Sequence, residues 1–379
     1  MRRRLLAGVL VLVLAGPSFA GDLGAWAPGN AGPTSEHVAR AVSTLPVAVV
    51  ARPAWTSAGT DPLDVARGPI EIRDDFIPAQ VRLTLPAVTP DPLGFGRWRL
   101  RALVNWGNDF AFSQKGPAES PFSDRRFLID GEHVTLNLEA LYGVSPTVDV
   151  GVRIPLQWRG AGVMDGLIDW FHRWTATDDN ARPEFFPNKY RAEGRTENFQ
   201  PLSWTDDPGF GLGNIELEAH WAFLRPRTLR GWRASLVGRV GLPTGTYPFD
   251  TGSVDLGAQL VVAKRVHRRV DLYGGIGGTW FSDTNVRGFE YEPWRFHAFL
   301  VAEWRAFRRL SFVMQSDYAT GLVTNLTDYP ATQWYLQAGL KYDLDRAART
   351  RLILGLREGL VDQQSPVDFA MWTGVEFRF

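Results

Sequence analysis

The last eleven residues place the strongest constraint on what this chain can fold into. Positions 369, 371, 373, 375, 377 and 379 share one face of an extended strand, and all but Thr373 are apolar. The other face carries Glu376 and Arg378. A tilted strand of this length could cross a bilayer. The closing strand of a bacterial outer-membrane barrel typically ends on an aromatic residue. Phe377 and Phe379 are therefore predicted to be the signal that the barrel-assembly machinery reads.

Eleven further segments show the same alternation of apolar and polar residues, each roughly ten residues long, as barrel strands are. Aromatic residues lie at both ends of the apolar face of a predicted strand, as Trp98 and Trp106 do on one strand and Trp294 and Trp304 on another. This placement predicts two aromatic girdles around the barrel. Lipid offers no partner for an open sheet edge, so we expect a closed antiparallel transmembrane β-barrel of about twelve strands. The further segments are 97–108, 132–142, 148–158, 214–224, 232–242, 254–266, 270–281, 294–304, 310–319, 334–343 and 351–359.

The segments before the barrel read differently. Arg2, Arg3 and Arg4 precede an apolar run that is too short for a membrane span, which needs roughly 20 residues. Small residues Ser18 and Ala20 follow, as a signal peptidase requires. We expect a signal peptide over 1–20, a flexible periplasmic leader over 21–68 and an extended segment over 69–96 that could plug the lumen. The barrel then occupies 97–379, and the protein is expected in the outer membrane.

Connections between the predicted strands alternate between short and long. Short periplasmic turns and long external loops are expected of an antiparallel barrel, with both termini periplasmic. The second external loop, residues 159–213, contains a helical pattern in which Val163, Leu167, Trp170, Phe171 and Trp174 share one face. This helix could be a lid over the barrel mouth or an anchor on the outer rim in the lipid interface. The sequence leaves both arrangements open.

The inward faces of the strands carry many charges of both signs. A charge that is buried without a partner is costly, so a lumen filled by ion pairs is favoured over a selective charged pore. The predicted lumen-facing charges are Arg97, Arg99, Arg101, Glu139, Arg153, Glu216, Glu218, Arg239, Arg295 and Glu303.

Several functional classes find no support in the sequence. The chain has no cysteine, which excludes disulfides and cysteine-based metal sites. Equal numbers of basic and acidic residues, 41 of each, give no reason to expect nucleic acid as a partner. His133, His172, His220 and His297 are not followed two residues later by Ser, as a barrel phospholipase would require. We therefore expect no catalytic residues, no cofactor and no metal.

Four motifs carry a family resemblance. They are Asp130-Gly-Glu132, the stretch 162–172, Gly241-Leu-Pro-Thr-Gly245 and Thr251-Gly-Ser-Val-Asp-Leu256. Together they resemble an uncharacterised family of Gram-negative outer-membrane barrels that is catalogued only as a domain of unknown function. The resemblance covers about residue 68 to the end of the chain. It implies an outer-membrane barrel and offers no established activity or functional residue.

The function expected from the sequence is a passive conduit for a small, apolar solute, gated by the second external loop. The alternative is a sealed structural or envelope-interaction barrel, and a weaker one is a lipid-modifying enzyme. Outer-membrane lipid is the expected surrounding. Solute identity and oligomeric state are beyond the sequence.

Signal-peptide cleavage is directly testable. We expect processing between Ala20 and Gly21, because the apolar run and the small residues before Gly21 fit a signal peptidase site. The intact mass of the membrane-extracted protein should match a chain that begins at Gly21. A mass that includes Met1 would contradict the prediction.

Overall fold

The structure, a computed structural model, describes residues 66–113, 127–166, 168, 170, 188–196, 200–226, 230–326, 329, 331–359, 367 and 369–379. The chain separates into two units, Met1–Ala58 and Gly59–Phe379, and only the second contains described residues. The predicted signal peptide and all but the end of the predicted leader lie outside the described residues. Among these residues, no helix is long and apolar enough to cross a bilayer.

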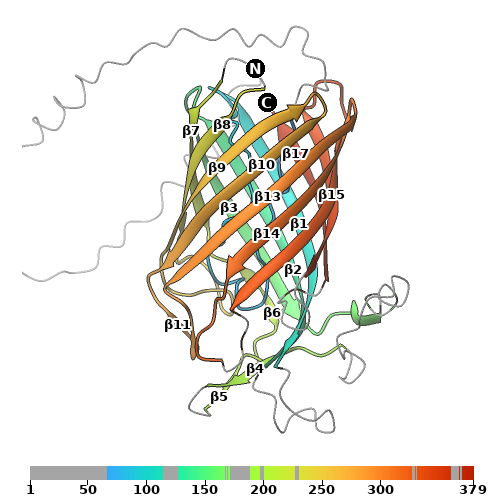
Figure 1. The fold of residues 1–379 in the computed structure, drawn as a ribbon. Helices are drawn as coiled ribbons and strands as arrows, with labels where there is room; N and C mark the ends of the chain where they lie inside the picture. Colours follow the sequence, from blue (N-terminus) through green and yellow to red (C-terminus); the bar gives the residue numbers. More distant parts are fainter. Residues whose placement is uncertain are drawn as a thin grey trace, which may run out of the picture. The chain divides into compact units, whose positions relative to one another are not determined.

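The predicted barrel is confirmed, with its twelve strands in the predicted order. Each strand pairs antiparallel with its neighbours, and pairing of the last strand with the first closes the sheet (Figure 1). Period-two alternation places one row of side chains outside and one inside, which is why the pattern could be read without any contact information. The barrel strands are β1 (Trp98–Phe112), β2 (Phe127–Gly143), β3 (Val148–Gly160), β7 (Glu216–Leu224), β8 (Arg233–Gly241), β9 (Asp255–His267), β10 (Val270–Phe281), β13 (Trp294–Phe307), β14 (Leu310–Thr320), β15 (Thr332–Asp343), β16 (Thr350–Gly359) and β17 (Phe369–Arg378).

The barrel has two distinct ends. Trp98 and Phe379 mark the terminal end, where their backbones exchange hydrogen bonds of 3.2 and 3.0 Å. The opposite loop end carries five short strands, β4 (Arg191–Arg195), β5 (Pro201–Ser203), β6 (Gly209–Leu212), β11 (Asn285–Val286) and β12 (Phe289–Glu290). β4 and β6 extend the sheet by pairing with β2 and β3 beyond the stretches that the neighbouring barrel strands cover. They supply the backbone hydrogen bonds that those long strands would otherwise lack.

The outer wall is apolar and ends on aromatic residues, as the sequence predicts. Trp294 and Trp304, at the loop end and toward the terminal end of β13, are 57% and 51% exposed. On the same strand the inward-facing Arg295 and Glu303 are fully buried. Such a surface suits lipid outside and a polar interior.

The helix predicted over 162–174 is not confirmed. Of its residues, only 162–166, 168 and 170 are described, and one helical hydrogen bond, from Ile168 N to Met164 O at 2.9 Å, is found among them.

The Phe379→Ala variant tests the predicted assembly signal. The side chain of Phe379 is 68% exposed at the terminal end, and the substitution keeps its backbone hydrogen bonds with Trp98, so the folded barrel loses little packing. A lower yield of folded, heat-modifiable barrel would therefore reflect recognition during assembly. Phe95→Ala is the control, because Phe95 is 70% exposed at the same end and precedes β1. Equal yields of the two variants would remove the special role of Phe379.

Candidate functional site

Residues 66–96, which we call the lumen segment, run through the lumen of the barrel as far as Leu93 and emerge at the terminal end, where Phe95 is exposed. The segment enters at the terminal end, where Arg67 bonds to the adjoining ends of β13, β14 and β15. It runs to the loop end, where Ile77 N donates to Asp109 Oδ2 of β1 at 2.9 Å. It then returns, and Leu93 N donates to Asp149 Oδ2, near the start of β3 and so at the terminal end, at 2.9 Å. The segment therefore passes through the lumen twice before β1 begins.

Arg67 anchors the first pass of the segment, which runs from the terminal end to the loop end. Its guanidinium binds Asp343 with an Nη2–Oδ2 distance of 2.6 Å and donates to Ser311 Oγ at 2.8 Å. Its backbone amide and that of Gly68 both donate to the Glu303 carboxylate, at 3.0 Å each for the shorter contacts. The side chain of Lys341 in turn donates to Arg67 O at 2.9 Å. Three strands thus hold the entry point.

The lumen segment has no regular secondary structure, so its backbone groups need partners from the wall. Gln315 supplies both kinds, since its Oε1 accepts from Ile70 N and its Nε2 donates to Ile70 O, each at 3.1 Å. Asp255 accepts from Leu83 N at 3.0 Å, and Gln259 donates to Pro86 O at 3.1 Å. Polar side chains of the wall therefore do for this segment what a neighbouring strand does in a sheet.

An apolar layer and a charged contact lie next to each other along the first pass of the segment. Ile70 and Ile72 are buried in a cluster with inward-facing apolar residues of the wall, among them Leu103 and Phe299. Between them, Glu71 takes two bonds from Arg99, at 2.9 and 3.0 Å, and one from Arg101 at 2.7 Å. The wall thus offers an apolar surface beside a pair of guanidinium groups.

The turn of the lumen segment is covered by the loops at the loop end of the barrel. Phe76 and Ile77 are fully buried in an apolar cluster with Trp204, Phe289 and other loop residues. Tyr291 OH donates to Pro78 O at 3.0 Å. Burial raises the pKa of the Tyr291 phenol, so the hydroxyl keeps the proton that it donates. These loop residues form a cap that covers the segment at the loop end.

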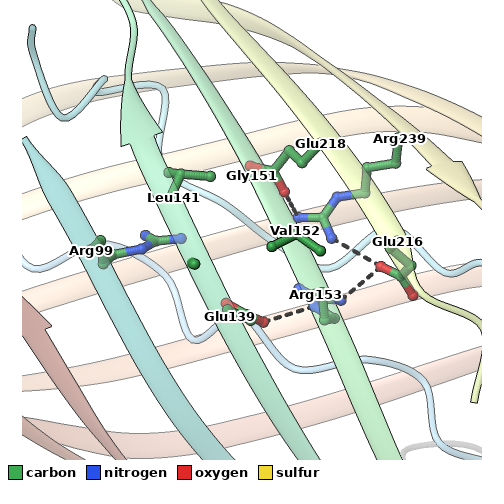
Figure 2. Close-up of a pocket in the computed structure, with 10 residues that line it drawn as sticks. Arg99, Glu139, Leu141, Gly151, Val152, Arg153, Glu216, Glu218 and Arg239 are labelled. Carbon is green, nitrogen blue, oxygen red and sulfur yellow. Dashed lines mark hydrogen bonds and ion pairs between the residues drawn. The ribbon is translucent and has the colours of Figure 1, made fainter. Parts of the chain in front are cut away.

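Charges on the wall form a belt of alternating sign. Figure 2 shows part of it, in which Arg153 bridges Glu139 and Glu216, and Arg239 bridges Glu216 and Glu218. The Arg153 Nε–Glu139 Oε1 distance is 2.7 Å and the Arg153 Nη1–Glu216 Oε2 distance is 3.2 Å. All of these side chains face inward and are at least largely buried.

The belt follows from the strand register. Opposite charges face each other on neighbouring strands from β15 through β17, β1, β2 and β3 to β8. Each such pair is close enough for direct interaction. The register partners are Asp343 and Arg351, Arg351 and Glu376, Glu376 and Arg101, Arg101 and Glu139, Glu139 and Arg153, Arg153 and Glu216, and Glu218 and Arg239.

A second charge cluster lies on β8, β9, β10 and β13. Asp271 of β10 is fully buried and binds Arg233 at 2.8 Å, Arg265 at 3.3 Å and also Arg305. Tyr273 and Ser311 hydroxyls donate to Glu303 nearby, at 2.9 and 2.8 Å. These carboxylates therefore have partners on the wall itself.

Nine of the ten predicted lumen-facing charges lie on the inner wall. Arg97 does not, because it precedes β1 and is exposed. Sequence reasoning missed Arg67 and Glu71, which lie in a segment without periodicity. It also missed Asp343 and Arg351, whose role depends on the register of β15 and β16. Alternation assigns a residue to a face, but it does not say which residue lies opposite.

The residues predicted as a gate are only partly described. Val163 is 73% and Trp170 is 55% exposed, whereas the neighbouring Met164 and Ile168 are buried. Leu167, Phe171 and Trp174 have no described side chains. Gating by this loop therefore stays a prediction.

One pocket lies among the belt residues of the wall. This pocket, lined by belt residues with Arg99 and Leu141, has an empty volume of about 260 Å³ that includes open solvent. Pockets for small-molecule ligands are roughly 300–1,000 Å³. Arg153 and Arg239 pair with glutamates of this lining (Figure 2), and Arg99 pairs with Glu71 of the lumen segment.

Two buried histidines pair with carboxylates. His133 Nδ1 lies 3.3 Å from Asp109 Oδ2, and His220 Nδ1 lies 3.4 Å from Asp149 Oδ2. In the part of the chain that the structure describes, neither Nε2 atom has a hydrogen-bond partner, so neither pair extends to a nucleophile. Among the same residues, no three His, Asp or Glu side chains are arranged to hold a metal ion.

Comparison with known proteins identifies a family and supports the barrel fold. A family model described as "Protein of unknown function (DUF3187)" matches residues 44–379. The chain is similar to an outer membrane channel from Pseudomonas putida F1, with a TM-score of 0.51 and 13% identity over 76% of this chain and 97% of that one. The toluene transporter TbuX from Ralstonia pickettii gives a TM-score of 0.39 and 10% identity over 85% of this chain and 98% of that one. No curated protein matches the sequence.

Variants of Glu376 and Glu71 distinguish the stability of the wall from the stability of the lumen segment. Glu376→Gln should destabilise the barrel, by about 3 kcal/mol, because Glu376 pairs with Arg351 at 3.2 Å and Arg378 at 2.8 Å inside the wall. Glu71→Gln should instead raise hydrogen exchange in residues 66–93 and leave the barrel strands protected. Thermal gel shift and exchange mass spectrometry measure the two effects. A Glu71→Gln barrel that unfolds as readily as Glu376→Gln would show that the wall depends on the segment.

Proposed function

This chain belongs to the DUF3187 family of outer-membrane β-barrels, for which no activity is established, and we propose that it is a passive conduit that the lumen segment holds closed. The terminal end would face the periplasm and the capped loop end would face the outside. Opening requires the lumen segment to move, because both of its passes occupy the only route through the barrel.

One observation carries this proposal: the wall charges are paired mainly with one another. The belt joins eight strands through pairs between wall residues, to which the lumen segment adds contacts at Asp343, Arg101 and Glu216. Asp271 binds three arginines of the wall. Other wall groups lose a partner when the segment moves: Asp255 binds Arg82 at 3.3 Å, Arg295 binds Asp74 at 2.7 Å, and Lys341 donates to Arg67 O at 2.9 Å. Water entering the lumen would have to solvate these groups, because a buried charge without a partner is costly. The wall–wall pairs confine that cost to part of the wall.

The contacts of the lumen segment indicate a class of solute. Ile70 and Ile72 fill an apolar layer, and the carboxylate of Glu71 between them binds Arg99 and Arg101. A small solute with an apolar body and one carboxylate would find the same partners once the segment has moved. This refines the apolar solute expected from the sequence by adding an acidic group.

A sealed structural barrel is the second candidate. The cap over Phe76 and Ile77 favours it, because opening the loop end would expose an apolar cluster of about twenty residues. In that case the segment would act as a core that stiffens the barrel, and no variant of the segment would create a pathway without loss of fold.

Conductance distinguishes the two candidates. Replacement of residues 69–90 by a short Gly–Ser linker is feasible because both ends of this stretch lie at the terminal end. We expect a folded barrel that conducts in planar bilayers, whereas the full-length chain stays closed most of the time. A folded, heat-modifiable deletion variant without conductance would support the sealed barrel.

A disulfide tests the same point without deletion. A Cβ atom at Gly241 would lie 3.6 Å from Leu83 Cβ, which is within the range of disulfide geometry, and the chain has no native cysteine. In the Leu83→Cys/Gly241→Cys variant, oxidation should abolish the openings of the full-length chain and dithiothreitol should restore them. Each single cysteine variant is the control. Openings that continue in the oxidised variant would show that the segment is not the gate.

The second external loop is tested separately. If it is a gate, Trp170→Ala with Trp174→Ala should increase conductance while the barrel stays folded, because both residues lie outside the barrel strands. If it is an anchor on the rim, conductance should not change. Planar-bilayer recordings of the wild type and the double variant decide between the two.

A further inference from the structure

Three polar residues lie on the outer face of the wall near the loop end. Asn108, Asp130 and Glu132 share the parity of the lipid-facing Trp106 and Val134, yet all three are buried. Lipid offers such side chains no hydrogen-bond partner, and burying a carboxylate without one is very costly. These residues therefore need a cover that supplies donors and acceptors.

The start of the second external loop is that cover. Glu132 Oε1 accepts a hydrogen bond from Met164 N, and its Oε2 accepts one from Trp106 Nε1 at 2.9 Å. Asn108 Nδ2 donates to Asp165 Oδ1 at 3.2 Å. The loop thus binds two neighbouring strands of the wall from outside and supplies partners to Glu132 and Asn108.

Apolar contacts fix the same stretch across the closing seam of the barrel. Met164 and Ile168 are buried with Phe369, and Trp106 and Met371 pack against this cluster. Trp106 and Met371 are register partners on β1 and β17, the strands whose pairing closes the barrel. Beyond Asn108, which is paired with Phe369, β17 covers no more of β1. The loop start lies at the point where the seam ends.

Gly162 makes this approach possible. Its φ of +63° is unfavourable for other residues, and a Cβ atom there would collide with the carboxylate of Glu132. A Cβ atom at Gly166, four residues later, would have no atom within 4 Å. The two glycines of the same stretch therefore differ in what a methyl group would meet.

We infer that residues 162–166, 168 and 170 form a clasp on the outside of the barrel wall and that its exposed side chains contact the interfacial region of the outer leaflet. Val163 and Trp170 are its most exposed apolar residues. The surface beneath them continues into the lipid-facing wall through Trp106 and Met371. Tryptophan suits this level of a membrane, where one edge of the ring meets lipid and the other meets water. The partner of the clasp is therefore lipid.

The inference is independent of the proposed conduit. A clasp on the outer wall neither covers the lumen nor contacts residues 66–96, so it would be present in an open, a closed or a permanently sealed barrel. Its contribution is to hold the loop end of the β1–β17 seam.

Site-directed spin labelling tests the contact with lipid. In the cysteine-free chain, a label at Val163→Cys in reconstituted liposomes should be accessible to oxygen and protected from a water-soluble nickel chelate. Gln200→Cys is the control, because Gln200 is exposed in the same external loop between β4 and β5. Its label should be accessible to the chelate. Equal chelate accessibility at both positions in a folded barrel would overturn the inference.

A matched pair of glycine variants tests the clasp by stability. Gly162→Ala should lower the temperature at which the barrel unfolds on a heat-modifiability gel by several degrees and expose the loop to protease. Gly166→Ala should change neither, because its methyl group meets nothing. If both variants match the wild type, the contact between the loop start and Glu132 is not part of the folded protein in solution.

Discussion

Strand register is the constraint on which the rest of this barrel depends. In a sheet, a slip of one residue moves every side chain to the opposite face. Here such a slip would place Glu139 and Arg153 in lipid and Leu138 in the lumen. Correct register instead brings opposite charges face to face along eight strands. The same interactions that neutralise the interior therefore also select one pairing of the strands over its neighbours.

Because register pairs many of the wall charges with one another, the wall does not depend on the lumen segment alone for neutralisation. The segment is held by many polar contacts, which water could replace, and by two apolar clusters, one around Ile70 and Ile72 and one around Phe76 and Ile77. A strand cannot leave a barrel in this way, because its backbone hydrogen bonds to two neighbours would have no substitute in lipid. The wall is fixed because backbone hydrogen bonds hold its strands. The lumen segment can be displaced because mainly side chains of the wall hold it.

The fold could be predicted from the sequence because lipid outside and charge inside impose a period of two on every strand. Nine of ten lumen-facing charges followed from the same rule. The path of residues 66–96 could not be predicted, since an irregular segment satisfied by distant side chains leaves no periodic trace. Partners such as Arg67 and Asp343 are 276 positions apart. The loop residues were harder still: helical periodicity grouped Val163 with Trp170, whereas the packed residues of that stretch are Met164 and Ile168.

The double pass of the lumen segment has a consequence for the order of folding. The segment is synthesised before any strand, yet it bonds to Glu303, Gln315 and Lys341 far downstream. Contacts so distant in sequence form late, because a long stretch of chain must first be brought together. Both ends of the segment emerge at the same opening, so no chain terminus has to be threaded through a closed ring. The part of the barrel that is made first is therefore the part that is seated last.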